Sequence, residues 1–399
     1  MRSSNALRLA FALCVITSAV NLQAPYYAAL AAHDGLGVAA TSVAFAAYVL
    51  GILPVLILLG GLPDRVGRRT LILTALCLCA IATALTLAVP GVVSLGVARL
   101  LMGIAAALTS ISAPAYMLAL FDTADSRGPT NWVTASTSLG FGLGAAATSL
   151  FLLHEPSLTP PSLWGYLGMA GLALILLLGL KDEPGVATPN GQFLRLPAYP
   201  AGSLPFGLSI LLAWAIVGVV IAVLPAILDR HDLSAWSGFA TLGICSGGVL
   251  FQPLARRLNP VTSVRLGLCI LPFAYTMLAW GSLTGSLTGV LAGALAASSA
   301  CYGFIYLGGL SGVLDAADGQ HSRASAGFFL MAYIGFSVPV VVTGTLVDRL
   351  GHTAALTLFG VLLLGSVLAV SRHLGRRGSI RPETVENDIA PDGCNRQGR

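Results

Sequence analysis

The stretch GGLPDRVGRRTL, residues 60–71, lies between two long apolar runs and gathers several charges within a few positions. These charged residues are Asp64, Arg65, Arg68 and Arg69. Each flanking run reaches the length of about 20 residues that a helix needs to cross a bilayer. Arginines in a short loop between two such helices hold that loop on the cytoplasmic side of a membrane. This rule accounts for the arginines but not for Asp64, which predicts a specific ion pair in the loop.

The composition extends this membrane interpretation to the whole chain of 399 residues. Only 9% of the residues are charged and 56% are hydrophobic, and the mean hydropathy is +0.85. Soluble domains, in contrast, carry about 25% charged residues. Because backbone polar groups within lipid must be satisfied inside their own segment, we expect an all-α integral membrane protein. The net charge of +5 lies in short loops and in the tail, so we expect no nucleic-acid partner.

Apolar runs of spanning length occur twelve times. The predicted spans cover approximately residues 6–30, 39–60, 70–90, 92–119, 131–153, 162–180, 206–228, 236–255, 264–283, 287–313, 325–346 and 353–373. The first run continues to bilayer length, so it is interpreted as a retained helix rather than a cleaved signal. Residues 181–205 carry five prolines and four charges, a composition typical of a linker. We therefore predict an N-terminal six-helix bundle over 1–180, a cytoplasmic linker over 181–205, a C-terminal six-helix bundle over 206–373 and a disordered cytoplasmic tail over 374–399.

The positions of the basic residues predict the orientation of this map. With a cytoplasmic amino terminus, 18 of the 21 lysines and arginines fall in cytoplasmic segments. Only Arg230 and Arg349 fall on the opposite side, and Arg99 lies within a span. Because basic residues collect in cytoplasmic loops, this distribution predicts that both termini are cytoplasmic. We expect a multi-pass protein of the cell membrane, the inner membrane in a bacterium.

Six spans, a central linker and six further spans, with GGLPDRVGRR after the second span, resemble the major facilitator superfamily. The signature of that family in this loop is G-x-L-x-D-R-x-G-R-R/K, and it is matched here by Gly60, Leu62, Asp64, Arg65, Gly67, Arg68 and Arg69. The resemblance implies the major facilitator fold, with twelve transmembrane helices in two six-helix bundles. It also implies that Asp64 forms a bridge between the bundles when the transport site faces outward. The alternative is a loop that only sets topology.

Two later segments echo this motif. QPLARRLNPV, residues 252–261, occupies the corresponding loop of the second half and keeps Arg256 and Arg257 but has no acid. GTLVDRLG, residues 344–351, repeats G-x-L-x-D-R-x-G on the outer side, between the last two spans. Both are consistent with an internally duplicated transporter.

Arg99 is the one ionisable residue well inside a predicted span. An intramembrane arginine is costly and normally faces a cavity or a partner. RLLMGIAAA, residues 99–107, is similar to the pattern R-x-x-Q-G-x-x-A of the fourth helix in this superfamily, with Arg99 and Gly103 matching and Met102 in place of glutamine. The corresponding arginine of drug–proton antiporters in this family is tied to proton coupling. The resemblance therefore implies a role of Arg99 in proton coupling. The alternative is a side chain that extends to the membrane interface. The fifth span, LGFGLGAAATS over residues 139–149, lacks the proline of a second antiporter signature.

The resemblance implies that the first, fourth, seventh and tenth spans line the transport path. The candidate cavity residues in these spans are Asn21, Gln23, Tyr26, Trp214, Tyr302 and Tyr306. Pro25 is expected to break the first span beside them. Aromatic rings with amides and hydroxyls suit an uncharged or anionic small molecule, and Arg99 is available for a negative group. No acid lies in the middle of a span, which argues against a site for organic cations and leaves the proton carrier unidentified. Ordinary packing between helices is the alternative for each residue.

Other classes of function are disfavoured. All six histidines lie in loops or at helix ends, and the sequence has no Walker motif and no H-E-x-x-H helix. Its cysteines form no C-x-x-C pair. We therefore predict no enzyme activity, no cofactor and no metal site. The predicted function is secondary active transport by alternating access, as efflux coupled to proton antiport. An uptake permease for a sugar or an organic anion is the alternative, and a non-transporting receptor or structural protein is the rival class. The expected partners are a small-molecule substrate, protons and membrane lipid, and we expect a monomer.

Overall fold

The computed structural model describes residues 2–121, 127–180 and 196–377, and these residues form helices and no strand. The first half contains α1 (Arg2–Leu22), η1 (Ala24–Tyr26), α2 (Tyr27–His33), α3 (Val38–Leu58), α4 (Pro63–Val66), α5 (Arg68–Ala88), α6 (Val92–Phe121), α7 (Arg127–Leu152) and α8 (Pro161–Leu178). The second half contains α9 (Leu204–Ala222), α10 (Leu224–Asp229), η2 (Ser234–Trp236), α11 (Ser237–Ser246), η3 (Gly247–Phe251), α12 (Gln252–Ala255), α13 (Pro260–Thr284), α14 (Leu287–Ser298), η4 (Ser299–Ile305), α15 (Tyr306–Asp315), α16 (His321–Leu350) and α17 (His352–Arg377). Among the described residues, twelve helices are long and apolar enough to cross a membrane, which confirms the predicted spans.

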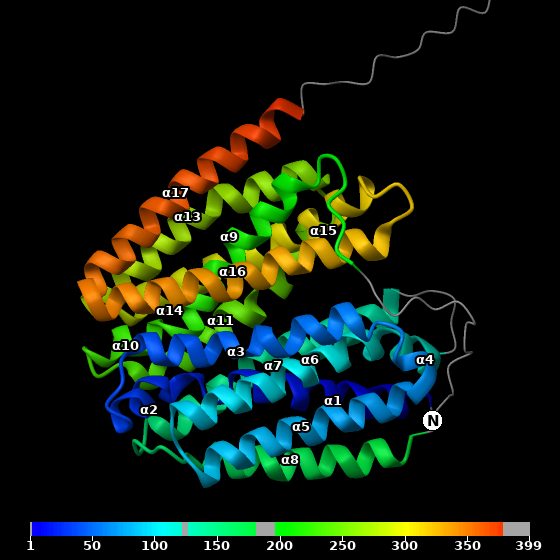
Figure 1. Ribbon diagram of the computed structural model, residues 1–399, viewed down its shortest axis with the longest axis horizontal. Helices are drawn as coiled ribbons and strands as arrows, with labels where there is room; N and C mark the ends of the chain where they lie inside the picture. The colour runs from blue at the N-terminus through cyan, green and yellow to red at the C-terminus, as the bar shows by residue number, and fades with distance from the viewer. Residues whose placement is uncertain (1, 122–126, 181–195, 378–399) are drawn as a thin grey trace, which may run out of the picture.

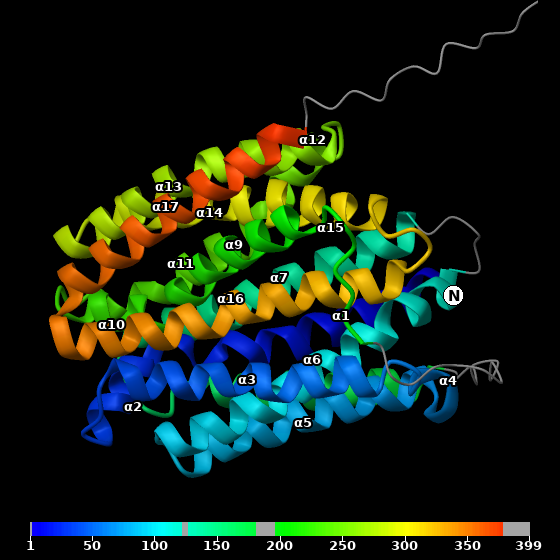
Figure 2. The same ribbon diagram turned by 45° about the horizontal axis from the view of Figure 1, so that its top comes forward.

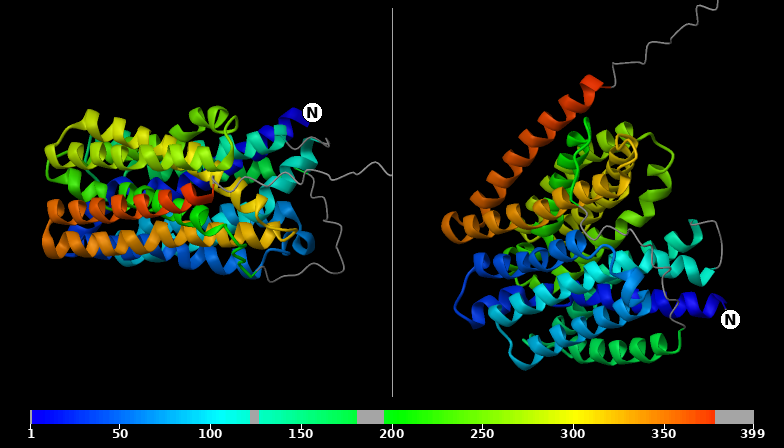
Figure 3. Two further views of the ribbon diagram at one scale, coloured as in Figure 1. Left: turned by 90° about the horizontal axis from the view of Figure 1, so that it is seen from above. Right: turned by 45° about the vertical axis from the view of Figure 1, so that its right-hand side comes forward.

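The helices form two bundles of six spans. Elements α1 to α8 make the first bundle and α9 to α17 the second; the two lie beside each other in Figure 1, the first coloured from blue to the green of α8 and the second from green to red. Helices α3 and α16 pack against each other across the interface, as do α7 and α11 (Figures 1 and 2). The long helices all run between the same two ends of the molecule (Figure 3). We call the end with the amino terminus and α4 the terminal end, and the end with α2 and α10 the far end (Figure 1).

Two spans at corresponding positions of the two halves are interrupted near the far end. The first span breaks at Gln23, with Pro25 in the short η1 helix that follows. The seventh breaks at Val223, with Pro225 in the first turn of α10. Proline has no N–H to donate and its ring collides with the preceding turn, which favours a break, although Pro54, Pro114, Pro272 and Pro339 lie inside unbroken helices. The predicted break at Pro25 is therefore confirmed. Paired breaks of this kind in repeated bundles mark the region where a transporter binds its substrate.

The element boundaries differ from the predictions in several places. Residues Pro63–Val66 form a helical turn, α4, that the sequence analysis did not expect, and α5 begins at Arg68 rather than near Thr70. Helix α9 begins at Leu204, inside the predicted linker. Helix α17 continues to Arg377, so residues 374–377 of the predicted disordered tail are helical, because the chain has no proline before Pro382 to end it. The remaining tail, residues 378–399, and linker residues 181–195 lie outside the described part of the chain.

Candidate functional site

Gln23 lies at the break of the first span, between the two bundles. The adjacent η1 turn contacts α7 of its own bundle and also α9 and α11 of the second bundle. The Gln23 side chain is 0% exposed, and neither Nε2 nor Oε1 has a hydrogen-bond partner in the described structure. Buried amides are almost always hydrogen-bonded to protein or water. The Gln23 amide therefore offers a donor and an acceptor that no described residue uses.

Asn21 lies two residues earlier and is fixed by its neighbours. Its Nδ2 donates a hydrogen bond of 2.9 Å to the Phe141 carbonyl of α7, and it lies 3.8 Å from the Cys245 sulfur of α11. This side chain therefore contacts both bundles, and its Oδ1 has no hydrogen-bond partner among the described residues. Tyr26, the third candidate in the first span, is buried within η1.

An aromatic row crosses from the first bundle to the second. It consists of Phe45 and Tyr48 on α3, Tyr333 and Phe336 on α16, Trp214 on α9 and Tyr302 on η4. The Phe45 and Phe336 ring centres are 4.7 Å apart and join the bundles. The Trp214 ring lies 5.7 Å from Phe336 and 6.2 Å from Tyr302. The indole Nε1 of Trp214 is buried without a hydrogen-bond partner in the described residues. Trp214 and Tyr302 therefore lie close together, and the indole N–H of Trp214 is a donor that no described residue uses.

The two candidate tyrosines of the tenth span contact different rings. Tyr302 lies in η4, a π-helical segment, whereas Tyr306 begins α15. A π-helical turn is wider than an α-helical turn and changes the spacing that four residues give. Tyr306 lies 6.4 Å from Phe328 and 6.2 Å from Phe329, whereas Tyr302 faces Trp214. Ser298, the last residue of α14, donates to the Ile244 carbonyl of α11 and so connects these two helices.

The sequence analysis did not predict Phe45, Tyr48, Tyr333 and Phe336 as members of the site. Phe45 and Tyr48 are three residues apart, as are Tyr333 and Phe336, so each pair lies on one helix face. That spacing was a usable signal. Which face meets the other bundle depends on tertiary packing, which the sequence alone does not specify.

Arg99 is completely buried on α6. Its Nη1 donates to the Val20 carbonyl in the last turn of α1, just before the break at Gln23. Its guanidinium carbon lies 4.5 Å from the Phe45 ring centre and 4.9 Å from that of Tyr48, so both rings make cation–π contacts with it. Nε and Nη2 have no partner among the described residues. Arg99 therefore faces the interior of the first bundle, and the alternative of a side chain that extends to the membrane–water interface is wrong.

Gly103 allows this arrangement to form. A Cβ at Gly103 would meet the Tyr48 carbonyl and lie 3.1 Å from the Ile52 nitrogen. Only glycine lets α6 approach α3 this closely, and that approach places the Tyr48 ring over Arg99. Gly103, which matched the antiporter pattern, thus has a packing role in this structure.

Arg68 and Arg69 of the loop over residues 60–71 contact helices of the first bundle. Gly67, with φ +93°, makes the turn between α4 and α5, and Gly60 is buried. Arg68 Nη1 donates to the Ala115 carbonyl at 3.3 Å. Arg69 donates to the Leu177 and Leu178 carbonyls at 3.0 and 2.8 Å, at the C-terminus of α8, where cations are favourable. The Asp64 side chain lies outside the described structure, so its bridge to the second bundle stays a prediction.

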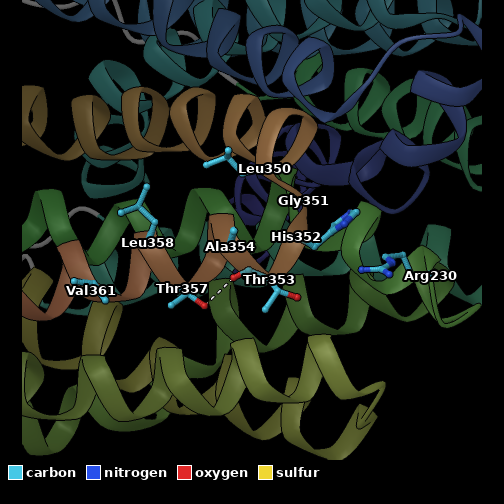
Figure 4. Close-up of a pocket in the computed structure, with 9 residues that line it drawn as sticks. All are labelled: Arg230, Leu350, Gly351, His352, Thr353, Ala354, Thr357, Leu358 and Val361. Carbon is cyan, nitrogen blue, oxygen red and sulfur yellow. Dashed lines mark hydrogen bonds between the residues drawn. The ribbon is translucent and has the colours of Figure 1, made fainter.

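A groove opens at the far end, away from the aromatic row. It has a volume of about 860 Å³ and is lined by Arg230, Leu350, Gly351, His352, Thr353, Ala354, Thr357, Leu358 and Val361 (Figure 4). All of these residues belong to the second bundle, and none is a predicted site residue. The described residues also contain no group of three or more His, Cys, Asp or Glu side chains that could hold a metal ion.

Two bundles of six spans with paired broken helices are the architecture of a helical membrane transporter. The chain belongs to the Major Facilitator Superfamily, whose family model matches residues 9–338. A search of curated proteins finds no match.

Solved structures of transporters share this fold. A point mutant of the nucleoside transporter NupG has a TM-score of 0.77 at 14% identity, covering 93% of this chain and 99% of that one. NupG without the mutation has a TM-score of 0.70 at 13% identity, covering 93% and 98%. The human organic anion transporter MFSD10 (TETRAN) has a TM-score of 0.57 at 18% identity, covering 94% and 99%. At these identities the likeness concerns the fold.

Proposed function

We propose that this protein exports an uncharged or anionic small molecule across the cell membrane by alternating access, in exchange for protons. The observation that carries the proposal is the buried polar site between the bundles, where Gln23 and Trp214 keep unused hydrogen-bonding groups. Gln23 lies at the break of the first span, and Trp214 lies on α9, nine residues before the break of the seventh span at Val223. A ligand held there would touch both bundles, so its binding would be sensitive to how the bundles are placed.

The charges near the site support this substrate class. Arg99 brings a positive charge to the first bundle, one ring away from the bundle interface. In the described residues, the only carboxylates within spans are Asp315 and Asp348, both in the last turn of a helix. A cationic substrate would therefore find no counter-charge in the middle of the membrane. The transporters named above for nucleosides and for organic anions handle substrates of the two charge types that we propose.

Proton exchange is supported by the position of Arg99 together with its resemblance to the antiporter pattern. Arg99 joins α6 to the last turn of α1, so a change at this contact would be passed directly to the broken first span. The missing proline in the fifth span and Met102 in place of glutamine favour the second candidate function, an uptake permease for a sugar or an organic anion.

The 18-to-2 distribution of basic residues supports a cytoplasmic position for the terminal end, with both chain termini inside.

We further propose that the loop over residues 60–71 acts as a conformational switch through Asp64. Asp64→Asn is then expected to impair transport while the protein still inserts into the membrane. Unchanged transport rates in this variant would refute the switch role.

Flux measurements in proteoliposomes test the proposal. Vesicles containing the purified protein are loaded in turn with nucleosides, organic carboxylates and sugars, and a pH gradient is imposed in each direction. An exporter that exchanges substrate for protons should release the loaded substrate faster when the outside is acidic. Acceleration by the opposite gradient would establish the permease as a proton symporter, and flux without gradient dependence would establish a uniporter. The absence of any flux for the whole panel would contradict transport of this substrate class.

A further inference from the structure

Asp348 connects the two bundles at the far end. It lies in the last turn of α16, in the second bundle, within the GTLVDRLG segment that repeats the loop motif. Its Oδ1 accepts a hydrogen bond of 2.9 Å from the Val38 N–H, and its Oδ2 accepts one of 2.8 Å from the Ala39 N–H. Val38 and Ala39 are the first two residues of α3, in the first bundle. The first N–H groups of a helix have no partner within the helix, and a carboxylate stabilises them. A residue of the second bundle thus supplies the N-terminal cap of a helix in the first.

Gly37 leaves room for the Asp348 carboxylate and cannot itself cap α3. It occupies the N-cap position of α3 and has no side chain with which to cap the helix itself. A Cβ at Gly37 would lie 2.6 Å from the Asp348 carboxyl carbon and 2.7 Å from Oδ1, closer than atoms can approach. One helical turn before Asp348, a Cβ at Gly344 would lie 2.9 Å from the Ser42 Cβ and 3.0 Å from the Val38 carbonyl. Helices α16 and α3 are therefore in close contact along this turn.

A second cap at the same end provides a comparison. The Asp34 carboxylate accepts a hydrogen bond of 2.6 Å from the Val92 N–H, at the start of α6, and pairs with His33 at 2.8 Å. Asp34, His33 and Val92 all belong to the first bundle. The two aspartates thus perform the same local task, but only the contact of Asp348 crosses between bundles. A movement that separates the bundles at the far end would break the cap of α3 and keep that of α6.

We propose that Asp348 is a latch that helps to hold the far end closed, and that its two hydrogen bonds to α3 form and break in each transport cycle. The latch rests on the proposed alternating access, because it has a role only if the bundles separate at this end. Its removal favours the form that is open at the far end, since that form loses nothing when Asp348 is absent. The closed form loses a cap, and loss of a cap changes such an equilibrium by about fivefold.

The test measures how often the far end opens. Ser42, completely buried where α3 meets α16, is changed to cysteine in a chain that keeps Cys79 and has its other native cysteines replaced by serine. Cys79 lies buried on α5, inside the first bundle, and reports general unfolding. The rate at which a water-soluble maleimide labels Ser42→Cys follows the fraction of molecules open at this end.

Asp348→Ala and Gly37→Ala are each expected to raise this rate by about fivefold, and together by little more than either alone. Asp348→Asn, which keeps one acceptor for α3, should give a smaller rise. Asp34→Ala, the matched control, should change the rate by less than about twofold, and Cys79 should stay unlabelled throughout. An unchanged rate in Asp348→Ala overturns the latch, as does an equal rise in Asp34→Ala or a parallel rise at Cys79. The labelling measurement needs no substrate and is therefore independent of the transport assay. Unchanged labelling rates in a protein that transports normally would contradict the latch but not the proposed function.

Discussion

The guanidinium of Arg99 lies 4.5 Å from the Phe45 ring, which in turn lies 4.7 Å from the Phe336 ring of the other bundle. One aromatic ring therefore separates a buried cation from the surface where the two bundles meet. The same cation holds the Val20 carbonyl just before the first span breaks. Its position links the packing of α3 and α16 to the shape of the candidate binding site.

Replacement of Arg99 tests this link. Arg99→Ala is expected to lower transport at least about tenfold, because both the Val20 contact and the positive charge are lost. Arg99→Lys keeps the charge but not the planar fork that bonds a carbonyl while stacking on rings, so it should restore transport only in part. Initial rates in proteoliposomes measure both effects.

Arg265→Ala serves as the control for Arg99. Arg265 also donates to a backbone carbonyl, that of Leu374 at 3.0 Å, but within the second bundle and away from the site. Its loss should leave transport within about twofold of the unmodified protein, as expected for a partly exposed polar contact. Equal losses in Arg99→Ala and Arg265→Ala would mean that Arg99 has only a structural role.

Gly103→Ala tests the close approach of α6 and α3. The added methyl group would meet the backbone of Tyr48 and Ile52, so the helices must separate, at a cost of about 1–3 kcal/mol. Gly165→Ala on α8 is the matched change, because a Cβ there would have no neighbour within 4 Å. Alanine forms helices better than glycine, so Gly165→Ala should raise the unfolding temperature while Gly103→Ala lowers it. Thermal unfolding in detergent measures both, and a Gly103→Ala protein as stable as Gly165→Ala would contradict the packing role.

Acid should weaken the cap of α6. The hydrogen bond from the Val92 N–H, and secondly that from His33, lower the pKa of Asp34 below its ordinary value. Because its pKa is lower in the folded state, the carboxylate stabilises the protein above its unfolded-state pKa, and this contribution is lost as the pH falls through the folded-state pKa. The unfolding temperature should therefore decrease below about pH 4, and less steeply in Asp34→Asn, which has no charge to lose. Glu155→Gln, at an exposed acid of the same end, should keep the steep dependence. An equally steep decrease in Asp34→Asn would show that this cap does not contribute.

Most of the fold was predictable because it depends on properties that a sequence displays directly. The length of the apolar runs determines the spans, and Pro25 determines where the first one breaks. The aromatic row was not predictable in the same way. Phe45 and Phe336 are far apart in the chain, and their contact depends on the angle between two bundles. Asp348 is the clearest case: its motif was visible as a repeat, but its partners are backbone N–H groups of α3, which no side-chain pattern indicates.

The last prediction concerns Gln23, whose amide is buried with neither Nε2 nor Oε1 paired, and its neighbour Asn21, whose Nδ2 donates to the Phe141 carbonyl while its Oδ1 is unpaired. An unsatisfied buried polar group costs about 1–3 kcal/mol, so Gln23→Leu, of similar volume, should stabilise the folded protein by about 1 kcal/mol or more. Asn21→Leu breaks an existing hydrogen bond and should destabilise it. Transport should fall in Gln23→Leu all the same, because the group that meets the substrate is gone. Unfolding temperature and transport rate, measured on both variants, separate binding from packing. If Gln23→Leu lowers stability as Asn21→Leu does, Gln23 is a packing residue and the site lies elsewhere between the bundles.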